Sequence, residues 1–66
     1  MGGYEVVFEV QNEYGEWVED FLNDNGKGFG KKDAYNVVRQ LMMNGMRKVR
    51  VETNGYSETK RRKRSA

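Results

Sequence analysis

The chain of 66 residues contains no cysteine and no histidine. Without cysteine it can form neither a disulfide nor a thiolate metal site, and its cysteine usage gives no indication of the redox compartment. Without histidine it lacks the imidazole ligand of many zinc sites and the side chain best suited to proton transfer near neutral pH. These two absences argue against most catalytic and metal-dependent functions.

Long apolar runs are also missing. No stretch approaches the roughly 20 apolar residues of a membrane span, and the amino terminus lacks the basic and then apolar pattern of a signal peptide. We therefore expect a soluble, intracellular, cytoplasmic protein with no membrane association. A chain of this length forms one domain with a small core, which a homodimer or a bound partner would help to stabilise.

The reactive side chains that remain are not arranged for catalysis. Glu19 and Asp20 are adjacent on a predicted strand, so they point to opposite faces and cannot act together on one substrate. Ser57 and Ser65 have no histidine to activate them. The run Asn23-Asp24-Asn25 does not fit a calcium loop, because no glutamate follows at the twelfth position. We predict no enzymatic activity, no cofactor and no metal.

Three segments have the pattern of strands. Residues 4–11 and residues 48–53 place apolar side chains at every second position, as is typical of half-buried strands. Residues 16–22 form the remaining strand, and their register is ambiguous because both faces carry apolar side chains. We predict that Trp17 and Phe21 face the core, since they would bury the largest area.

That choice of register has a consequence for the opposite side of the sheet. It leaves Val7, Val18 and Leu22 together on the outer face. Aromatic residues at four positions, Tyr4, Phe8, Trp17 and Phe21, also alternate with charges, as they do in surfaces that stack single-stranded bases. Their charged neighbours are acidic and would repel phosphates, so we predict that these aromatic side chains pack in the core.

A glycine-rich loop leads into the segment with helical periodicity. We expect Gly30 to be the N-cap, Phe29 to pack on Ala34, and Asn44-Gly45 to end a helix of about residues 31–44. Apolar residues recur there at spacings of three and four and lie along one stripe, which consists of Ala34, Val37, Val38, Leu41, Met42 and Gly45.

These elements predict an α+β fold. An antiparallel three-stranded sheet carries one helix on one face, in the chain order ββαβ, with the strand order 2-1-3. Asn54-Gly55 is a strong turn signal, after which residues 56–60 form either a short fourth strand at the sheet edge or no regular structure. We predict a single domain over residues 1–59 and a disordered basic tail over residues 60–66.

Charge is segregated along the chain. Residues 1–26 contain seven acidic residues and no basic one, whereas residues 27–66 contain all twelve basic residues and three acidic ones. In the predicted sheet the strand that carries Glu5 and Glu9 lies beside the strand that carries Lys48 and Arg50. Cross-strand ion pairs would then neutralise part of this segregation.

The most specific functional feature is the basic run at the carboxyl end. Adjacent cations neutralise phosphates and release counterions, which gives an affinity that depends on salt but not on base sequence. The run would equally serve as a targeting signal or as a solubilising tail. Cations of the domain would extend the phosphate-binding surface. The candidate nucleic-acid-binding residues are Lys60, Arg61, Arg62, Lys63 and Arg64 in the tail and Lys31, Lys32, Arg47, Lys48 and Arg50 in the domain.

The loop before the helix, residues 26–32, has the outline of a phosphate-binding loop. Its spacing fails the specific tests, however. A Walker A motif requires glycine five residues before Gly30 and serine or threonine after Lys31, but this sequence has Asn25 and Lys32 there. We interpret the loop as a connector whose glycines permit unusual backbone angles.

The acidic hairpin suggests a different function. Carboxylates at regular strand spacing imitate a phosphate backbone, and apolar side chains among them suit a protein partner or a second copy of the chain. The alternative hypothesis is therefore a protein-binding accessory or inhibitor protein. Its candidate residues are Glu5, Val7, Glu9, Glu16, Val18, Asp20 and Leu22.

Overall fold

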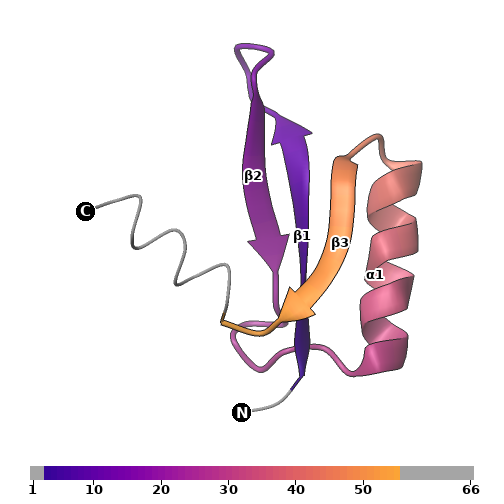
Figure 1. Ribbon diagram of the computed structural model, residues 1–66. Helices are drawn as coiled ribbons and strands as arrows, with labels where there is room; N and C mark the ends of the chain where they lie inside the picture. Colours follow the sequence, from indigo (N-terminus) through magenta and orange to yellow (C-terminus); the bar gives the residue numbers. More distant parts are fainter. Residues whose placement is uncertain (1–2, 56–66) are drawn as a thin grey trace.

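The computed structural model of the chain describes residues 3–55. The elements follow in the order β1 (Tyr4–Gln11), β2 (Trp17–Leu22), α1 (Lys31–Met43) and β3 (Arg47–Thr53). The strands form one antiparallel sheet in the order β2-β1-β3, and α1 packs against one face over β1 and β3 (Figure 1). The predicted α+β fold and strand order are confirmed. The predicted fourth strand and the basic tail lie outside the described residues.

The hairpin turn between β1 and β2 sets the register of the sheet. Asn12 closes a short loop, because its Oδ1 accepts hydrogen bonds from the backbone N–H groups of Tyr14 (2.9 Å) and Glu16 (3.0 Å). Gly15 has a φ of +82°, the left-handed conformation that such a loop requires before the second strand. The turn therefore pairs Gln11 with Trp17 and fixes every later pair of the hairpin.

This register overturns the predicted orientation of β2. Directly opposed residues of an antiparallel pair share a face, so Trp17 and Phe21 lie with Gln11 and Val7, on the side of the sheet turned away from α1. Val18 and Leu22 lie on the helix side, opposite Val10 and Val6. The prediction that Trp17 and Phe21 face the main core is wrong, because the turn geometry decides the register and the larger buried area does not.

A β-bulge interrupts the pairing of β1 with β3. Val7 is opposite Arg50 and Glu9 is opposite Arg47, so two steps along β1 correspond to three steps along β3. The extra residue is accommodated at Lys48, which adopts a φ of +55°. In a regular strand, positions 47 and 50 would point to opposite faces, but the bulge turns both arginines to the side away from α1.

The helix ends as the sequence predicts, within one residue. Gly30 is the N-cap and makes no side-chain capping hydrogen bond, and Asn44 is the C-cap. Gly45 follows with a φ of +85°. Its N–H donates to the Met42 carbonyl (3.2 Å) and the Met46 N–H donates to the Leu41 carbonyl (3.1 Å), which together form a Schellman motif.

The buried apolar core is small. Val6, Val7, Phe8 and Ala34 are its members. Val6 and Phe8 point toward α1, whereas Val7 points to the other side of the sheet. Residues 3–55 contain no helix with the length and apolar character needed to cross a membrane.

Candidate nucleic-acid interface

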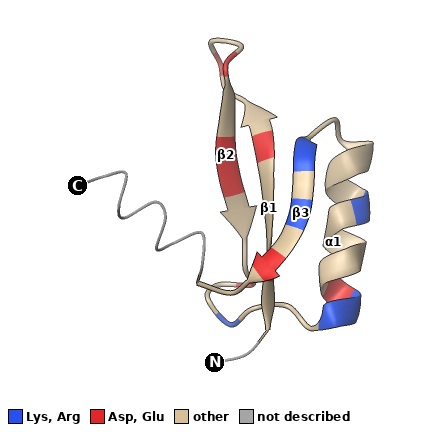
Figure 2. Cartoon of the chain, viewed as in Figure 1, with Lys and Arg blue, Asp and Glu red and all other residues tan. Residues whose placement is uncertain are grey.

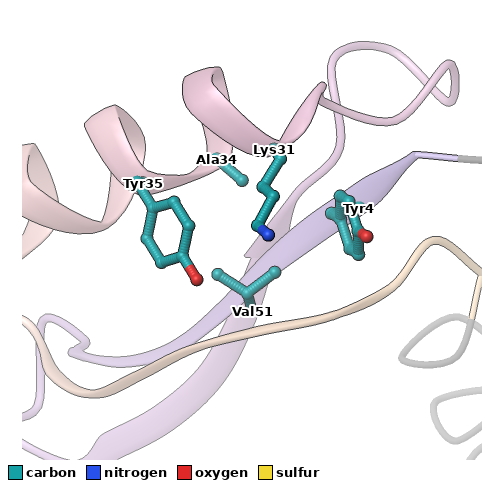
Figure 3. A pocket seen from close by; sticks show the side chains of 5 residues that line it. All are labelled: Tyr4, Lys31, Ala34, Tyr35 and Val51. Atoms are coloured by element: carbon teal, nitrogen blue, oxygen red, sulfur yellow. The ribbon is translucent and has the colours of Figure 1, made fainter.

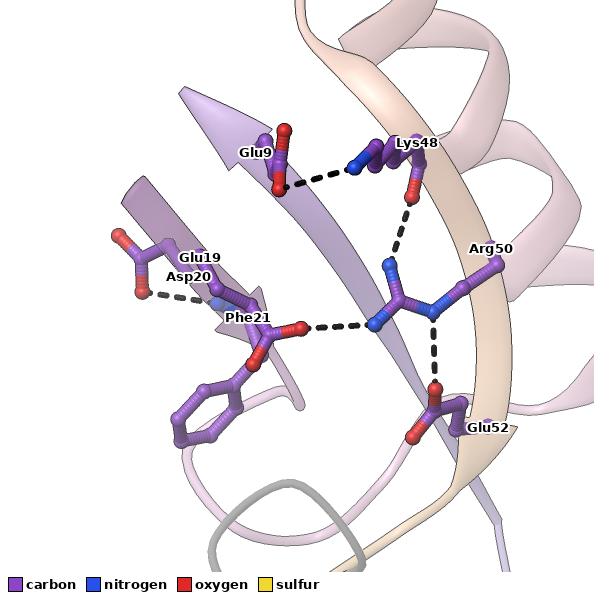
Figure 4. A network of polar contacts seen from close by, with 7 residues as sticks. All are labelled: Glu9, Glu19, Asp20, Phe21, Lys48, Arg50 and Glu52. Atoms are coloured by element: carbon purple, nitrogen blue, oxygen red, sulfur yellow. Dashed lines mark hydrogen bonds and ion pairs between the residues drawn. The ribbon is translucent and has the colours of Figure 1, made fainter. Parts of the chain in front are cut away.

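The face of the sheet turned away from α1, called here the distal face, carries a network of ion pairs. Its centre is Arg50 on β3, whose Nη2 donates to Glu19 Oε2 on β2 (2.7 Å) and whose Nε donates to Glu52 Oε2 (2.9 Å) (Figure 4). Its Nη1 also donates to the Lys48 carbonyl at the bulge (2.9 Å). Since β1 lies between β2 and β3, the bond from Arg50 to Glu19 spans the central strand on the face to which Val7 points.

Arg47 makes a second link across the sheet. Its Nε donates to Glu9 Oε1 on β1 (2.9 Å), and its guanidinium carbon lies 4.0 Å from the centroid of the Trp17 ring on β2. Lys48 Nζ approaches Glu9 Oε2 at 3.6 Å. The cations of β3 thus neutralise carboxylates of β1 and β2. This agrees in part with the cross-strand ion pairs that the sequence predicts. The structure pairs Glu9 with Lys48, and it pairs Arg50 with Glu19 and Glu52.

These contacts shift two ionisation equilibria. The hydrogen bond from Arg47, aided by the charges of Lys48 and Arg47, holds the pKa of the Glu9 carboxyl below its usual value against the opposing effect of desolvation. The hydrogen bond to Glu19, and then the bond to Glu52, raise the pKa of Arg50. Three of the candidate phosphate ligands, Arg47, Lys48 and Arg50, are therefore bound to carboxylates of the same chain, and phosphate would have to displace those partners.

The remaining domain candidates lie at the amino end of α1. Lys31 and Lys32 occupy its first turn and Lys27 lies in the loop before it, and all three are exposed (Figure 2). Within residues 3–55, none of these three lysines forms an ion pair. We name them the amino-end cluster. The backbone N–H groups of the first helical turn add partial positive charge there, whereas Asp24 in the loop and Asp33 in the first turn contribute two carboxylates.

Hydrogen bonds fix this end of the molecule. Tyr4 and Phe29 exchange two backbone bonds of 2.9 and 2.7 Å, which attach the loop before α1 to the start of β1. Asn54 Nδ2 donates to the Gly26 carbonyl (3.1 Å), so the chain beyond β3 also returns to that loop. The amino-end cluster and the last described residue, Gly55, therefore share one end of the domain (Figure 1).

The candidate tail residues, Lys60 to Arg64, lie outside the described residues. The basic run begins five positions after Gly55 in the sequence. Five residues span at most about 18 Å, which limits the distance between Gly55 and the first residue of the run.

The candidate protein-binding residues do not form one surface. Glu5, Val7 and Glu9 point to the distal face, and the first two are fully buried. The Glu5 carboxylate accepts a hydrogen bond from the Gly55 N–H (3.3 Å). Val18, Asp20 and Leu22 are exposed on the opposite side of β2, and Glu16 lies in the hairpin turn, where it accepts a bond from Asn12 Nδ2 (3.1 Å). Of the candidate residues, four are therefore exposed: Glu16, Val18, Asp20 and Leu22.

The aromatic residues also divide between the two faces. Phe8 is buried beneath α1, whereas Trp17 and Phe21 are partly exposed on the distal face. Tyr4 is 39% exposed, so the prediction that it belongs to the core is wrong. It lies at the first position of β1 and borders a pocket beside the first turns of α1.

Sequence reasoning missed Lys27, Arg39 and Tyr35. Arg39 and Tyr35 are exposed on α1, and Arg39 forms no ion pair within residues 3–55. The sequence did contain a way to find the two missed cations. The three cations of β3 can be assigned to carboxylates of the paired strands. Removing them from the set of candidates leaves the cations of the loop and the helix.

In comparisons with known proteins, no family model, curated protein or solved structure matches the chain. Between residues 3 and 55, no three carboxylates gather closely enough to hold a metal ion.

Proposed function

We propose that this chain is a non-enzymatic module that binds nucleic-acid phosphates through two groups of cations. One is the basic run from Lys60 to Arg64, and the other is the amino-end cluster. The proposal depends above all on one observation: the cations of β3 are bound to carboxylates, whereas Lys27, Lys31 and Lys32 are exposed and form no ion pair within residues 3–55. They lie at the end of the domain from which the chain continues to the basic run. Such a cluster attracts polyanions at any base sequence.

Binding across a salt series tests this function. The full chain is titrated with labelled single- and double-stranded DNA and RNA, beside a full-length variant in which Gln replaces all five residues from Lys60 to Arg64. Each phosphate contact that is lost should reduce the slope of log K against log salt by about 0.7 to 0.9. We expect the tail variant to lose most of the salt dependence, and Lys31→Gln or Lys32→Gln to lose about one contact each.

Lys48→Gln is the matched control. Lys48 is also an exposed lysine, but it is already paired with Glu9. Its replacement should leave the salt slope nearly unchanged, although it alters the net charge as much as Lys32→Gln does. Equal effects of these two variants would show that only net charge matters and would contradict the amino-end cluster. Absence of binding by the full chain at low salt would contradict the function itself.

A protein-binding or inhibitory role is the second candidate. One observation favours it: Val18 and Leu22 are exposed apolar residues on the same side of β2, with Asp20 between them. This surface is smaller than the predicted acidic hairpin, because Glu5 and Val7 are buried. If the full chain binds no nucleic acid, the exposed residues of β2 become the surface to examine with a protein partner or a second copy of the chain.

A further inference from the structure

A pocket of about 140 Å³ lies between the first turns of α1 and the sheet (Figure 3). Two tyrosines, Tyr4 from β1 and Tyr35 from α1, line it on opposite sides, and the Lys31 amine projects between them. Ala34 and Val51 complete its lining with small apolar side chains. The pocket thus combines two aromatic rings, one cation and a small apolar floor.

The fold itself places these side chains together. Lys31, Ala34 and Tyr35 are three and four positions apart, so they lie on one side of the helix. Tyr4 is held beside that turn by its two backbone bonds with Phe29. The backbones of the two segments lie close together beside this bridge. A Cβ added to Gly3 would lie only 3.1 Å from the Gly28 Cα. Ala34 is buried, and its short side chain leaves the space that a larger residue would fill.

The exposure of the two tyrosines suggests a ligand with a flat apolar ring. Tyr4 is 39% exposed and Tyr35 is 56% exposed, although both border the same cavity. The volume is well below the roughly 300 to 1,000 Å³ of pockets that enclose a whole small molecule. The pocket therefore suits one planar ring inserted from outside, and Lys31 favours a ring that carries an anionic group.

We propose that this pocket takes one unstacked base of a single-stranded nucleic acid, which stacks on the tyrosines while Lys31 contacts its phosphate. The inference rests on the proposed function and adds to it a preference for single strands. Bases of single strands are free to stack on aromatic side chains, whereas the faces of paired bases are hidden inside a duplex. A preference for single strands does not follow from the cations alone, because they attract both forms.

The helix also offers a contact for a neighbouring phosphate. Arg39 lies one turn beyond Tyr35, which itself lies one turn beyond Lys31, so the two cations flank the tyrosine along α1. Their separation along the helix axis is about 12 Å, from a rise of about 1.5 Å per residue. A single strand running along α1 would therefore meet a cation on each side of the stacked base.

Substitution of Tyr35 in the full chain tests the proposal. Tyr35→Ala should weaken binding to a single-stranded 12-mer of DNA or RNA by roughly fivefold to 150-fold, the range measured for loss of one base–aromatic stack. Tyr35→Phe keeps the ring and should bind as the wild type does. Tyr14→Ala is the matched control, because Tyr14 is 78% exposed in the hairpin turn, at the far end of the sheet from the pocket. None of the three variants should alter binding to a duplex of the same length.

An abasic single strand provides a second measurement that requires no variant. The wild type should bind it more weakly than the normal strand by the same factor that Tyr35→Ala loses, and it should retain the salt slope of the basic run. If Tyr35→Ala binds as the wild type does, if it weakens duplex binding equally, or if the abasic strand binds as tightly as the normal one, the pocket takes no base and the phosphate-binding function still stands. If the wild type binds none of these probes at low salt, the proposed function fails, and this inference fails with it.

Discussion

Glu9 and Glu19 occupy directly opposed positions on β1 and β2. Like charges in that arrangement repel, and the sheet tolerates them because each carboxylate has a cationic partner from β3. Arg47 and Lys48 contact Glu9, whereas Arg50 contacts Glu19. The two arginines therefore remove a repulsion as well as adding an attraction, so the pairing has more effect than an isolated surface ion pair, which contributes at most about 1 kcal/mol.

The lowered pKa of Glu9 predicts a specific dependence of stability on pH. A carboxyl whose pKa is lower in the folded state stabilises the fold above its ordinary pKa of about 4.3, and this contribution is lost as the pH falls through the folded value. Glu9→Gln should therefore destabilise the protein at pH 7, and its difference from the wild type should shrink toward pH 3. Urea unfolding at both pH values measures this change.

Glu13→Gln is the control for that experiment. Glu13 is exposed in the hairpin turn, and within residues 3–55 it forms no ion pair. Its replacement should change the free energy of unfolding little at either pH. A Glu9→Gln variant whose destabilisation was the same at pH 7 and pH 3 would show that the ion pair with Arg47 does not stabilise the sheet.

At the scale of elements, the bulge in β3 is the feature that creates the distal ion network. It turns Arg47 and Arg50 to the same face although they are three positions apart. The bulge carries a non-glycine residue at positive φ, which costs roughly 1 to 2 kcal/mol relative to glycine. The network on the distal face therefore offsets a local backbone strain at Lys48.

Replacement of Lys48 separates its charge from its backbone conformation. Lys48→Gly and Lys48→Ala both remove the contact with Glu9, but only glycine adopts a φ of +55° without a Cβ penalty. The glycine variant should be more stable than the alanine variant by about 1 kcal/mol. Urea unfolding midpoints of the two variants provide the comparison. An alanine variant of equal or greater stability would show that position 48 is not left-handed.

The elements themselves could be predicted from the sequence, but the orientation of β2 could not. The period of two in β1 and the spacing of three and four in α1 report local amphipathicity, which tertiary packing then uses. β2 carries apolar side chains on both faces, so its periodicity could not choose between Trp17 and Val18. The turn that contains Asn12 and Gly15 decides between them, because its geometry sets the register of the hairpin.

The candidate site was predictable to a lesser extent. Lys31 and Lys32 were recognisable as cations at the start of a helix. The predicted cross-strand ion pairs put Arg50 on the face of Glu5 and Glu9, and Arg50 does lie on that face. Arg47 could not be placed there, because its orientation depends on the bulge and Lys48 carries no glycine signal for one. The pocket between Tyr4 and Tyr35 joins residues 31 positions apart in the sequence, and it depends on the bridge between Tyr4 and Phe29. No local pattern encodes such a bridge.

At the scale of the molecule, pairing on the distal face leaves unbalanced charge at the two ends. The acidic residues Glu13 and Glu16 lie at the hairpin turn, and the amino-end cluster lies at the opposite end (Figure 2). A polyanion is therefore repelled from one end and attracted to the other, which orients its approach. The pocket lined by Tyr4 and Tyr35 lies at the attractive end, because Lys31 of the first helical turn also lines it (Figure 3).

The whole molecule depends on a very small apolar core, so a single large-to-small change should remove a large part of its free energy of unfolding. A chain of 66 residues is expected to have a free energy of unfolding of roughly 3 to 10 kcal/mol. Phe8 is the largest apolar side chain in the core, and Phe8→Ala should cost about 3 to 5 kcal/mol through lost burial and a residual cavity. We expect Phe8→Ala to unfold at a much lower urea concentration than the wild type, as measured by circular dichroism across a urea titration.

Tyr14→Ala is the matched control for this prediction, since it removes an aromatic ring that is mostly exposed. Its free energy of unfolding should stay within about 0.5 kcal/mol of the wild type. The two variants also show which face of the sheet contributes more to the free energy of unfolding. If Phe8→Ala unfolded at the same urea concentration as Tyr14→Ala, the packing of α1 on β1 would contribute little, and the ion network with Val7 beneath it would have to hold the three strands together. The expected large difference would instead show that the helix side supplies most of the stability, while the distal face mainly fixes which strands pair.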